Sequence, residues 1–271
     1  MDNRPIGVFD SGVGGLTAVR QLQQLLPGED IVYFGDTGRV PYGTRSPETI
    51  IQYAQQDVRF LLSRDVKYLL AACGTISSIL PRSWTDALPV PYRGVLDAAV
   101  RAAVKASKTG RIGVIGTPAT IKSGSYQQRI AALRPDAQVF ANPCPMFVPL
   151  VENGYVEVGN PVTTSIAKEY LAPLKAAGVD TLIMGCTHYP LISGIIYEVM
   201  EGQAVLIDPG REAALETCSI LEQEGLLSEE GRTGRSEYFV SDLPENFESA
   251  MTRFLHPDRI AAPQVAAIEN Y

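Results

Sequence analysis

The chain has 271 residues, of which 45% are hydrophobic and 20% charged, a composition typical of a globular rather than a disordered protein. Its formal net charge of −7 disfavours a role in binding the phosphate backbone of nucleic acids. No stretch approaches the roughly 20 apolar residues that a membrane helix needs. The first residues also lack the basic and apolar regions of a signal peptide. We therefore expect a cytoplasmic protein that binds neither membranes nor nucleic acids.

Short apolar runs alternate with amphipathic stretches along the whole chain. In chain order the first part predicts a strand at 6–9, a helix at 16–26, a strand at 31–34, a helix at 47–63, a strand at 68–72 and a helix at 98–107. The rest predicts strands at 112–115 and 138–141, a helix at 163–177, a strand at 181–184, a helix at 194–200, a strand at 205–207, a helix at 211–222, a strand at 238–240 and a helix at 244–255. Such alternation indicates an α/β fold with parallel sheets covered by helices on both faces. Ligands of these sheets gather at the carboxyl ends of the strands.

Two pairs of segments resemble each other. IGVFDSG at 6–12 resembles IGVIGTP at 112–118, at an offset of 106 residues (112 − 6). YLLAACGT at 68–75 resembles TLIMGCT at 181–187, at an offset of 113 residues (186 − 73). Strands of parallel sheets look alike in general, but the second pair also ends each strand with a cysteine. This pattern predicts two similar halves that bring Cys73 and Cys186 face to face.

Two facing thiols suit a reaction that inverts a carbon centre. Such a reaction removes a proton from one face of the α-carbon and returns one to the other face, so each side needs a group that acts both as acid and as base. A cysteine, with an ordinary pKa of about 8.5, can serve when its neighbours tune it. His188 is placed to share the proton of Cys186, and Asp10 is expected to raise the pKa of Cys73. These residues predict a cofactor-independent amino-acid racemase.

The remaining cysteines and histidines do not suggest another kind of site. Cys144 and Cys218 are expected to be buried core residues, and His256 a surface or packing residue. The chain has no CxxC pair and only two histidines, so neither a metal site nor a disulfide framework is expected.

Several motifs together resemble a known family. They are IGVFDSGVGGLT at 6–17, YFGDT at 33–37, PYG at 41–43, AAC at 71–73, GVIGT at 113–117 and GCTHYPL at 185–191. Their order across nearly the whole chain resembles the bacterial glutamate racemases of the aspartate/glutamate racemase superfamily. The resemblance implies two similar α/β domains related by a pseudo-twofold axis, with the active site at their interface. It further implies a discontinuous first domain, 1–96 plus 208–271, and a second domain, 97–207.

The resemblance also implies a function and a set of site residues. The reaction would be the interconversion of L- and D-glutamate without pyridoxal phosphate or metal, by a homodimer that supplies D-glutamate for peptidoglycan. By family role, Cys73 and Cys186 are the catalytic acid/base pair, assisted by Asp10, Glu152 and His188. The substrate-binding residues implied by the resemblance are Asp10, Ser11, Tyr42, Gly43, Gly74, Thr75, Thr117, Thr187 and His188.

One position departs from the family's pattern. The family usually has asparagine after the first catalytic cysteine, where this chain has Gly74. Glycine cannot supply a side-chain hydrogen bond, although its backbone amide can approach a ligand more closely. Loss of one such bond commonly costs about 1–3 kcal/mol. We therefore expect weaker substrate binding with an intact acid/base pair.

Three other functions stay open from the sequence. The run 12–15 (GVGG) resembles a dinucleotide fingerprint, and Asp36 lies near the distance of a ribose-binding acid, but Thr17 occupies the third glycine position. A nucleotide-binding oxidoreductase also leaves both cysteine motifs unexplained. A non-catalytic amino-acid-binding protein would not need the two cysteines and His188. A racemase for aspartate or another acidic amino acid would share the chemistry and differ in pocket size.

Overall fold

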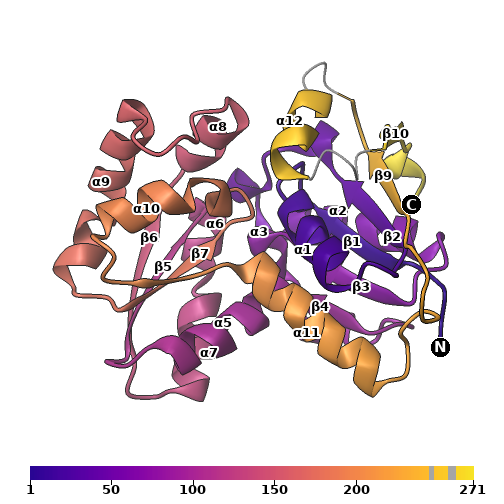
Figure 1. Cartoon of the computed structure of the whole chain (residues 1–271), viewed down its shortest axis with the longest axis horizontal. Helices are drawn as coiled ribbons and strands as arrows, with labels where there is room; N and C mark the ends of the chain where they lie inside the picture. The colour runs from indigo at the N-terminus through magenta and orange to yellow at the C-terminus, as the bar shows by residue number, and fades with distance from the viewer. Residues whose placement is uncertain (244–246, 256–260) are drawn as a thin grey trace.

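The computed structural model describes residues 1–243, 247–255 and 261–271, and contains two parallel sheets side by side, each covered by helices (Figure 1). This arrangement confirms the predicted α/β fold. Residues 244–246 of the predicted helix at 244–255, and His256, lie outside the described residues. Within the described part of the chain, no helix is long and apolar enough to cross a membrane.

The first half of the molecule is built on a six-stranded sheet. In sheet order its strands are β10 (Gln264–Val265), β9 (Ser236–Val240), β2 (Ile31–Gly35), β1 (Ile6–Asp10), β3 (Tyr68–Ala71) and β4 (Tyr92–Gly94). The helical elements between these strands are α1 (Leu16–Leu25), η1 (Thr37–Arg39), η2 (Tyr42–Thr44), α2 (Pro47–Leu62), α3 (Gly74–Ile79), α4 (Arg82–Thr85) and α12 (Phe247–Phe254), with η5 (Ile268–Asn270) at the end.

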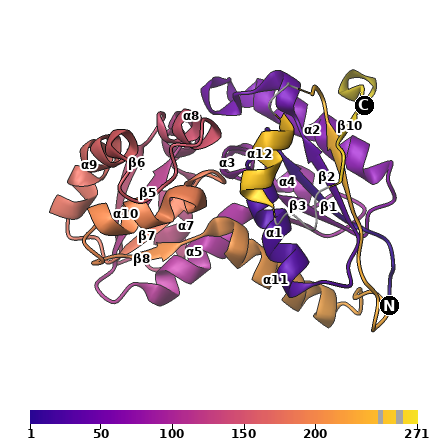
Figure 2. The ribbon, with the colours of Figure 1, turned by 45° about the horizontal axis from the view of Figure 1, so that its top comes forward.

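The second half is built on a four-stranded sheet. In sheet order its strands are β6 (Gln138–Pro143), β5 (Arg111–Gly116), β7 (Thr181–Gly185) and β8 (Val205–Ile207). Its helical elements are α6 (Pro118–Ser123), α7 (Ser125–Leu133), α8 (Phe147–Glu152), α9 (Pro161–Ala176), η3 (Tyr189–Ile192) and α10 (Ser193–Val199). The helices α5 (Val95–Ala106) and α11 (Pro209–Gln223) pack against each other where the chain passes between the halves (Figure 2).

The two sheets share both strand order and register. The order β2-β1-β3-β4 in the first half corresponds to β6-β5-β7-β8 in the second. Ile6 pairs with Tyr68 in the first sheet, and Ile112 pairs with Thr181 in the second. These four residues begin the segments that resemble each other in the sequence. The carboxyl ends of β3 and β7 therefore occupy equivalent places in the two sheets.

Every predicted strand is present, but several short elements were not predicted. The strands β4 and β10 have three and two residues, and the helices α3, α4, α6 and α8 have four to six. An apolar period is recognised over 11–18 residues, so segments of this length carry too little of it. Helix α7, with nine residues, was also missed because it buries only Tyr126 and Ile130.

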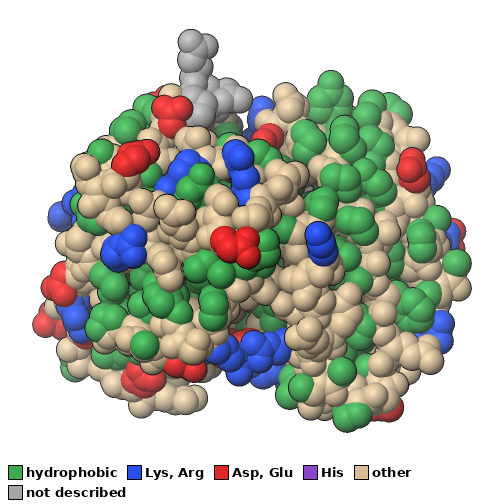
Figure 3. Space-filling model, turned by 180° about the vertical axis from the view of Figure 1, so that it is seen from behind, with side chains coloured by type: hydrophobic (Ala, Val, Ile, Leu, Met, Phe, Trp, Pro, Cys, Tyr) green, Lys and Arg blue, Asp and Glu red, His purple; other side chains and the backbone are tan. Residues whose placement is uncertain are grey.

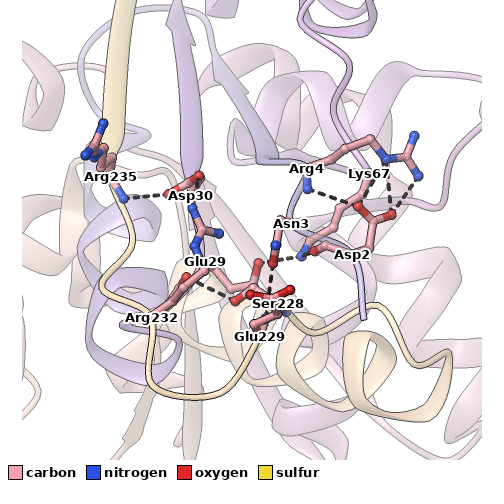
Figure 4. Close-up of polar contacts among 11 residues, drawn as sticks. Asp2, Asn3, Arg4, Glu29, Asp30, Lys67, Ser228, Glu229, Arg232 and Arg235 are labelled. Carbon is pink, nitrogen blue, oxygen red and sulfur yellow. Dashed lines mark hydrogen bonds and ion pairs between the residues drawn. The ribbon is translucent and has the colours of Figure 1, made fainter.

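A buried polar network closes the amino-terminal edge of the first sheet (Figure 4). Lys67 and Glu29 are almost fully buried, and their charged atoms lie 2.5 Å apart. Lys67 also donates to the carbonyl of Asp2 at 2.6 Å, and Glu29 accepts from the backbone amide of Ser228 at 2.7 Å. Because the partners satisfy both charges, removing one of them would leave the other buried and unpaired. The network joins the N-terminal segment, the α1–β2 loop and the segment after α11.

The back of the molecule shows a furrow between two lobes, with Lys and Arg side chains gathered at its lower end (Figure 3). Where α4, α5 and α11 meet, Arg82 pairs with Asp97 at 2.9 Å and Arg101 pairs with Glu216 at 2.5 Å. Both arginines are more than half exposed, so these ion pairs contribute little to stability. The helices α5 and α11, which pack against each other here, each bury an apolar face.

Candidate active site

A cavity of about 420 Å³ is lined by residues of both halves at the carboxyl ends of their strands. Cys73 follows β3 and Cys186 follows β7, and both line it. Strand ends of this kind are where α/β sheets bind ligands. The predicted site residues that line the cavity are Ser11, Tyr42, Gly43, Cys73, Gly74, Thr75, Thr117, Glu152, Cys186, Thr187 and His188.

Cys73 stands at the start of α3 and is almost completely buried. Its sulfur lies 3.5 Å from the hydroxyl of Ser11. Burial, together with the charge of the neighbouring Asp10, raises the pKa of the Cys73 thiol to about 12, and the contact with Ser11 only partly offsets this. The thiol therefore holds its proton at neutral pH.

Asp10, the last residue of β1, is not among the residues that line the cavity, although the next residue, Ser11, is. Its Oδ2 accepts hydrogen bonds from the backbone amides of Gly12 at 3.1 Å and Gly15 at 3.0 Å. Its Oδ1 is buried without a hydrogen-bond partner among the described residues. Burial raises the pKa of Asp10, whereas the positive charge of His188 and the two amides lower it. The carboxylate of Asp10 therefore lies next to Cys73, and its predicted contact with the substrate stays a prediction.

Cys186 belongs to a chain of polar groups that leads out of the cavity. Its sulfur lies 3.9 Å from Nδ1 of His188, and Nε2 of His188 lies 2.9 Å from Oε1 of Glu152. Burial disfavours a charged imidazole, but the hydrogen bonds to Cys186 and Glu152 outweigh it and raise the pKa of His188 to about 10. Glu152 ends α8, and its side chain is 44% exposed. We call these three residues the relay, because they connect the thiol to solvent.

Thr75 and Thr117, one from each half, line the cavity, and their hydroxyls contact that of the buried Thr120. Thr75 of α3 lies 2.9 Å from the hydroxyl of Thr117 and 3.3 Å from that of Thr120, and the last two are 3.0 Å apart. Thr117 also caps α6, accepting a hydrogen bond from the Thr120 amide. Hydroxyls can rotate to donate or accept, so this cluster suits a carboxylate or ammonium group.

Tyr42 lines the cavity, but its hydroxyl is used elsewhere. It donates to Oδ2 of Asp36 and lies 3.4 Å from Asp57, and both carboxylates are fully buried. Arg39 completes this cluster at 2.6 Å from Asp36. Tyr42 therefore lines the cavity while the buried carboxylates engage its hydroxyl, and its binding of substrate stays a prediction. Asp36 is likewise engaged, and so does not serve as a ribose-binding acid.

Two glycines let the halves approach each other next to the cysteines. A Cβ at Gly74 would lie 2.3 Å from the carbonyl oxygen of Gly185, the residue before Cys186. A Cβ at Gly14 would lie 2.2 Å from the Thr187 hydroxyl and 2.5 Å from Nδ1 of His188. Real Cβ atoms do not come so near, so a side chain at either place must displace its neighbours. Gly74 thus has a packing reason that the sequence did not reveal.

Of the other two cysteines, Cys144 lies at the cavity and Cys218 lies away from it. Cys144 is buried as expected, yet it also lines the cavity, directly after β6. Its place after a predicted strand was the available signal. Cys218 is only partly buried and lies on α11, outside the cavity lining. The residues that the structure describes contain no group of three or more His, Cys, Asp or Glu side chains able to hold a metal ion.

Comparisons with known proteins agree on one family. The Asp/Glu/Hydantoin racemase family model matches residues 6–217. The chain is 43% identical over 252 residues to a glutamate racemase of Geobacter metallireducens, covering 93% of both chains, and 45% identical over 251 residues to one of Syntrophus aciditrophicus, covering 93% and 92%. A crystal structure of glutamate racemase from Francisella tularensis in complex with D-glutamate matches over 100% of both chains, with 38% identity and a TM-score of 0.92. This chain belongs to the Asp/Glu/Hydantoin racemase family.

Proposed function

We propose that the protein is a glutamate racemase that interconverts L- and D-glutamate by two-base proton transfer without a cofactor. The observation that carries the proposal is the placement of Cys73 and Cys186 at equivalent strand ends, in one cavity lined by both halves. The relatives with 43% and 45% identity are glutamate racemases. We further propose that the halves are separate domains, 1–96 plus 208–271 and 97–207.

In the proposed reaction the α-carbon of glutamate lies between the two sulfurs. One cysteine, as thiolate, takes the α-proton, so that the C–H bond breaks, an S–H bond forms and the electron pair stays on the substrate as a carbanion. The other cysteine then gives its proton to the opposite face of the α-carbon and becomes the thiolate. The thiols have exchanged protonation states, which readies the enzyme for the reverse direction.

The surroundings of the two thiols support different resting roles, one as acid and the other as base. Cys73 holds its proton because burial and Asp10 raise its pKa, so it suits the role of acid at rest. A charged His188 beside Cys186 stabilises negative charge on that sulfur, which suits the role of base. Glu152 accepts from His188 and gives the relay a route to solvent.

The polar lining is suited to the fixed groups of glutamate. The hydroxyls of Ser11, Thr75, Thr117 and Thr187 offer donors and acceptors for its carboxylates and ammonium group. The backbone amides of Gly43 and Gly74 complete the proposed binding site. Tyr42 would form a wall of the site through its ring.

The same geometry argues against the other functions. Gly14, within the glycine run 12–15, packs against Thr187 and His188, so the run joins the halves instead of cradling a pyrophosphate. A non-catalytic binding protein gives no role to the relay. A racemase for aspartate keeps the same chemistry, and direct comparison of the substrates separates the two. We also propose that the protein acts as a cytoplasmic homodimer that supplies D-glutamate for the cell wall.

The experiment that tests the proposed function is incubation of the purified protein with L-glutamate and no added cofactor, followed by chiral chromatography. We expect D-glutamate to form until the enantiomers are equal. L-Aspartate is assayed in parallel, and a higher kcat/KM for it would favour the aspartate alternative. Absence of D-glutamate at high enzyme concentration would refute the proposal.

A further inference from the structure

Helix α12 belongs to the first half, but two of its side chains contact the relay of the second half. The ring of Phe254 lies 5.5 Å from the imidazole of His188, centroid to centroid, at an angle of 83°. Arg253 donates from Nη1 to the backbone carbonyl of Glu152 at 2.5 Å. Figures 1 and 2 show α12 beside α1, on the side of the first half that faces α8.

The relay works in one orientation of the imidazole. Nδ1 must face Cys186 while Nε2 faces Glu152, at 3.9 Å and 2.9 Å, and rotation of the ring breaks one or both contacts. Phe254 stands nearly perpendicular to the ring, an edge-to-face arrangement that aromatic pairs prefer. The first half touches the same ring at Gly14, where an added Cβ would lie 2.5 Å from Nδ1. The first half therefore restricts a ring whose proton partners both lie in the second.

We propose that Phe254 and Arg253 are positioning residues that hold the relay against Cys186. Phe254 fixes the plane of the His188 ring, and Arg253 fixes the end of α8 from which Glu152 projects. The alignment of the relay then depends on α12 being docked between the halves. This inference rests on the proposed function, because the relay has a task only if Cys186 exchanges protons.

The other contacts of α12 separate this role from simple packing. Phe247, Met251 and Phe254 are all buried in the same hydrophobic cluster, so each contributes to docking. Arg253 is exposed, so its bond to Glu152 adds little to the core. The ionisable groups around the His188 ring are Asp10 of β1, Cys186, Glu152 and Arg253, and substitution of Phe254 changes none of them. Phe247 is thus a matched control for loss of an aromatic ring from the same helix.

The test compares Phe254→Leu with Phe247→Leu in the full chain, using glutamate deuterated at the α-carbon as each enantiomer. L- and D-glutamate have equal free energy, so kcat/KM must change equally in both directions, but the isotope effect in each direction reports on the thiol that removes the proton. For Phe254→Leu we expect kcat to fall about tenfold or more with KM nearly unchanged. In the direction in which Cys186 removes the α-proton, the isotope effect should rise. In the direction in which Cys73 removes it, the isotope effect should fall. Phe247→Leu should leave both isotope effects as in the wild type.

The variant Cys73→Ser identifies the direction in which Cys186 removes the α-proton. In D₂O this variant should exchange the α-proton of only one enantiomer for deuterium. Arg253→Ala is the second variant, since an exposed position tolerates substitution, and it should give the same isotope pattern with a smaller fall in kcat. If Phe254→Leu does not fold, Arg253→Ala decides. Unchanged isotope effects in an active, folded Arg253→Ala or Phe254→Leu protein would overturn the inference. A wild type that does not racemise glutamate would instead overturn the proposed function.

Discussion

The surroundings of Cys73 and Cys186 differ, although the two residues occupy equivalent strand ends. Cys73 faces Ser11 and the buried carboxylate of Asp10, which favour a retained proton. Cys186 faces His188 and, through it, the half-exposed Glu152. One thiol is thus enclosed, and the other is connected to solvent. Two halves with the same topology supply the symmetry that racemisation needs, while the residues after the strands make the resting protonation states unequal.

The difference arises in very few residues. The register of the central strands is the same in both halves, whereas β1 ends in Asp10 and β5 in Gly116. Cys73 is followed by Gly74, and Cys186 by Thr187 and His188. The strands position the two thiols, and the residues just after the strands determine the protonation state of each thiol at rest.

The largest effect is expected for removal of either thiol. Cys73→Ser and Cys186→Ser should each reduce racemisation by about a thousandfold or more, because a serine hydroxyl does not ionise in the required range. Circular dichroism should show an unchanged fold. Cys218→Ser, outside the cavity, is the matched control and should keep normal kcat/KM. Full activity in either of the first two variants would end the assignment of two bases.

The next largest effect is expected for loss of the relay, which should affect Cys186 more than Cys73. His188→Asn removes the imidazole that connects Cys186 to Glu152, so kcat should fall about a hundredfold. Stopped assays in each direction with α-deuterated substrate should show the slower step at Cys186. An equal effect on proton transfer at Cys73 and at Cys186 would mean that the relay does not act on Cys186 in particular.

A side chain at Gly74 should disturb both sides together. In Gly74→Ala the new Cβ collides with the carbonyl oxygen of Gly185, which moves Cys186 relative to Cys73. We expect a loss of about 1–3 kcal/mol in unfolding free energy and a fall of about tenfold or more in kcat. Gly210→Ala is the control, since its Cβ would meet its nearest atoms at 3.4 Å, an ordinary contact. Wild-type activity in Gly74→Ala would show that the close approach is unimportant.

His188 should also make the stability of the protein depend on pH. The pKa of His188 is raised in the folded protein to about 10, so protonated His188 stabilises the fold below its ordinary pKa of about 6.5. This stabilisation should be lost progressively as pH rises from about 6.5 to about 10. Urea unfolding of the wild type and of His188→Asn across this range measures it. The difference between the two free energies should shrink with pH, and a constant difference would contradict the assigned shift.

Much of this arrangement was predictable because it depends on local patterns. The apolar runs located every strand except β4 and β10, and the repeated cysteine at two strand ends located the pair. The family resemblance supplied Glu152, for which the residues themselves gave no signal. Helix α12 is present over Phe247–Phe254, but its contact with His188 depends on how the halves pack.

The remaining features are fixed by long-range packing. The commitment of the Tyr42 hydroxyl to Asp36 and Asp57 depends on how the loop folds back on α2. The space restriction at Gly74 arises from a residue more than a hundred positions away, and no local pattern encodes it. Cys144 reaches the cavity because β6 lies beside β5, which is a property of the sheet order.

The most direct test of two facing thiols is racemisation of L-glutamate in D₂O, stopped early and analysed by mass spectrometry of the separated enantiomers. Two bases on opposite faces take the proton with one thiol and deliver solvent deuterium with the other. Newly formed D-glutamate should therefore carry deuterium at the α-carbon, while the remaining L-glutamate is still protiated. D-glutamate that retains the original proton would show that a single base serves both faces, and would contradict the assignment of two bases.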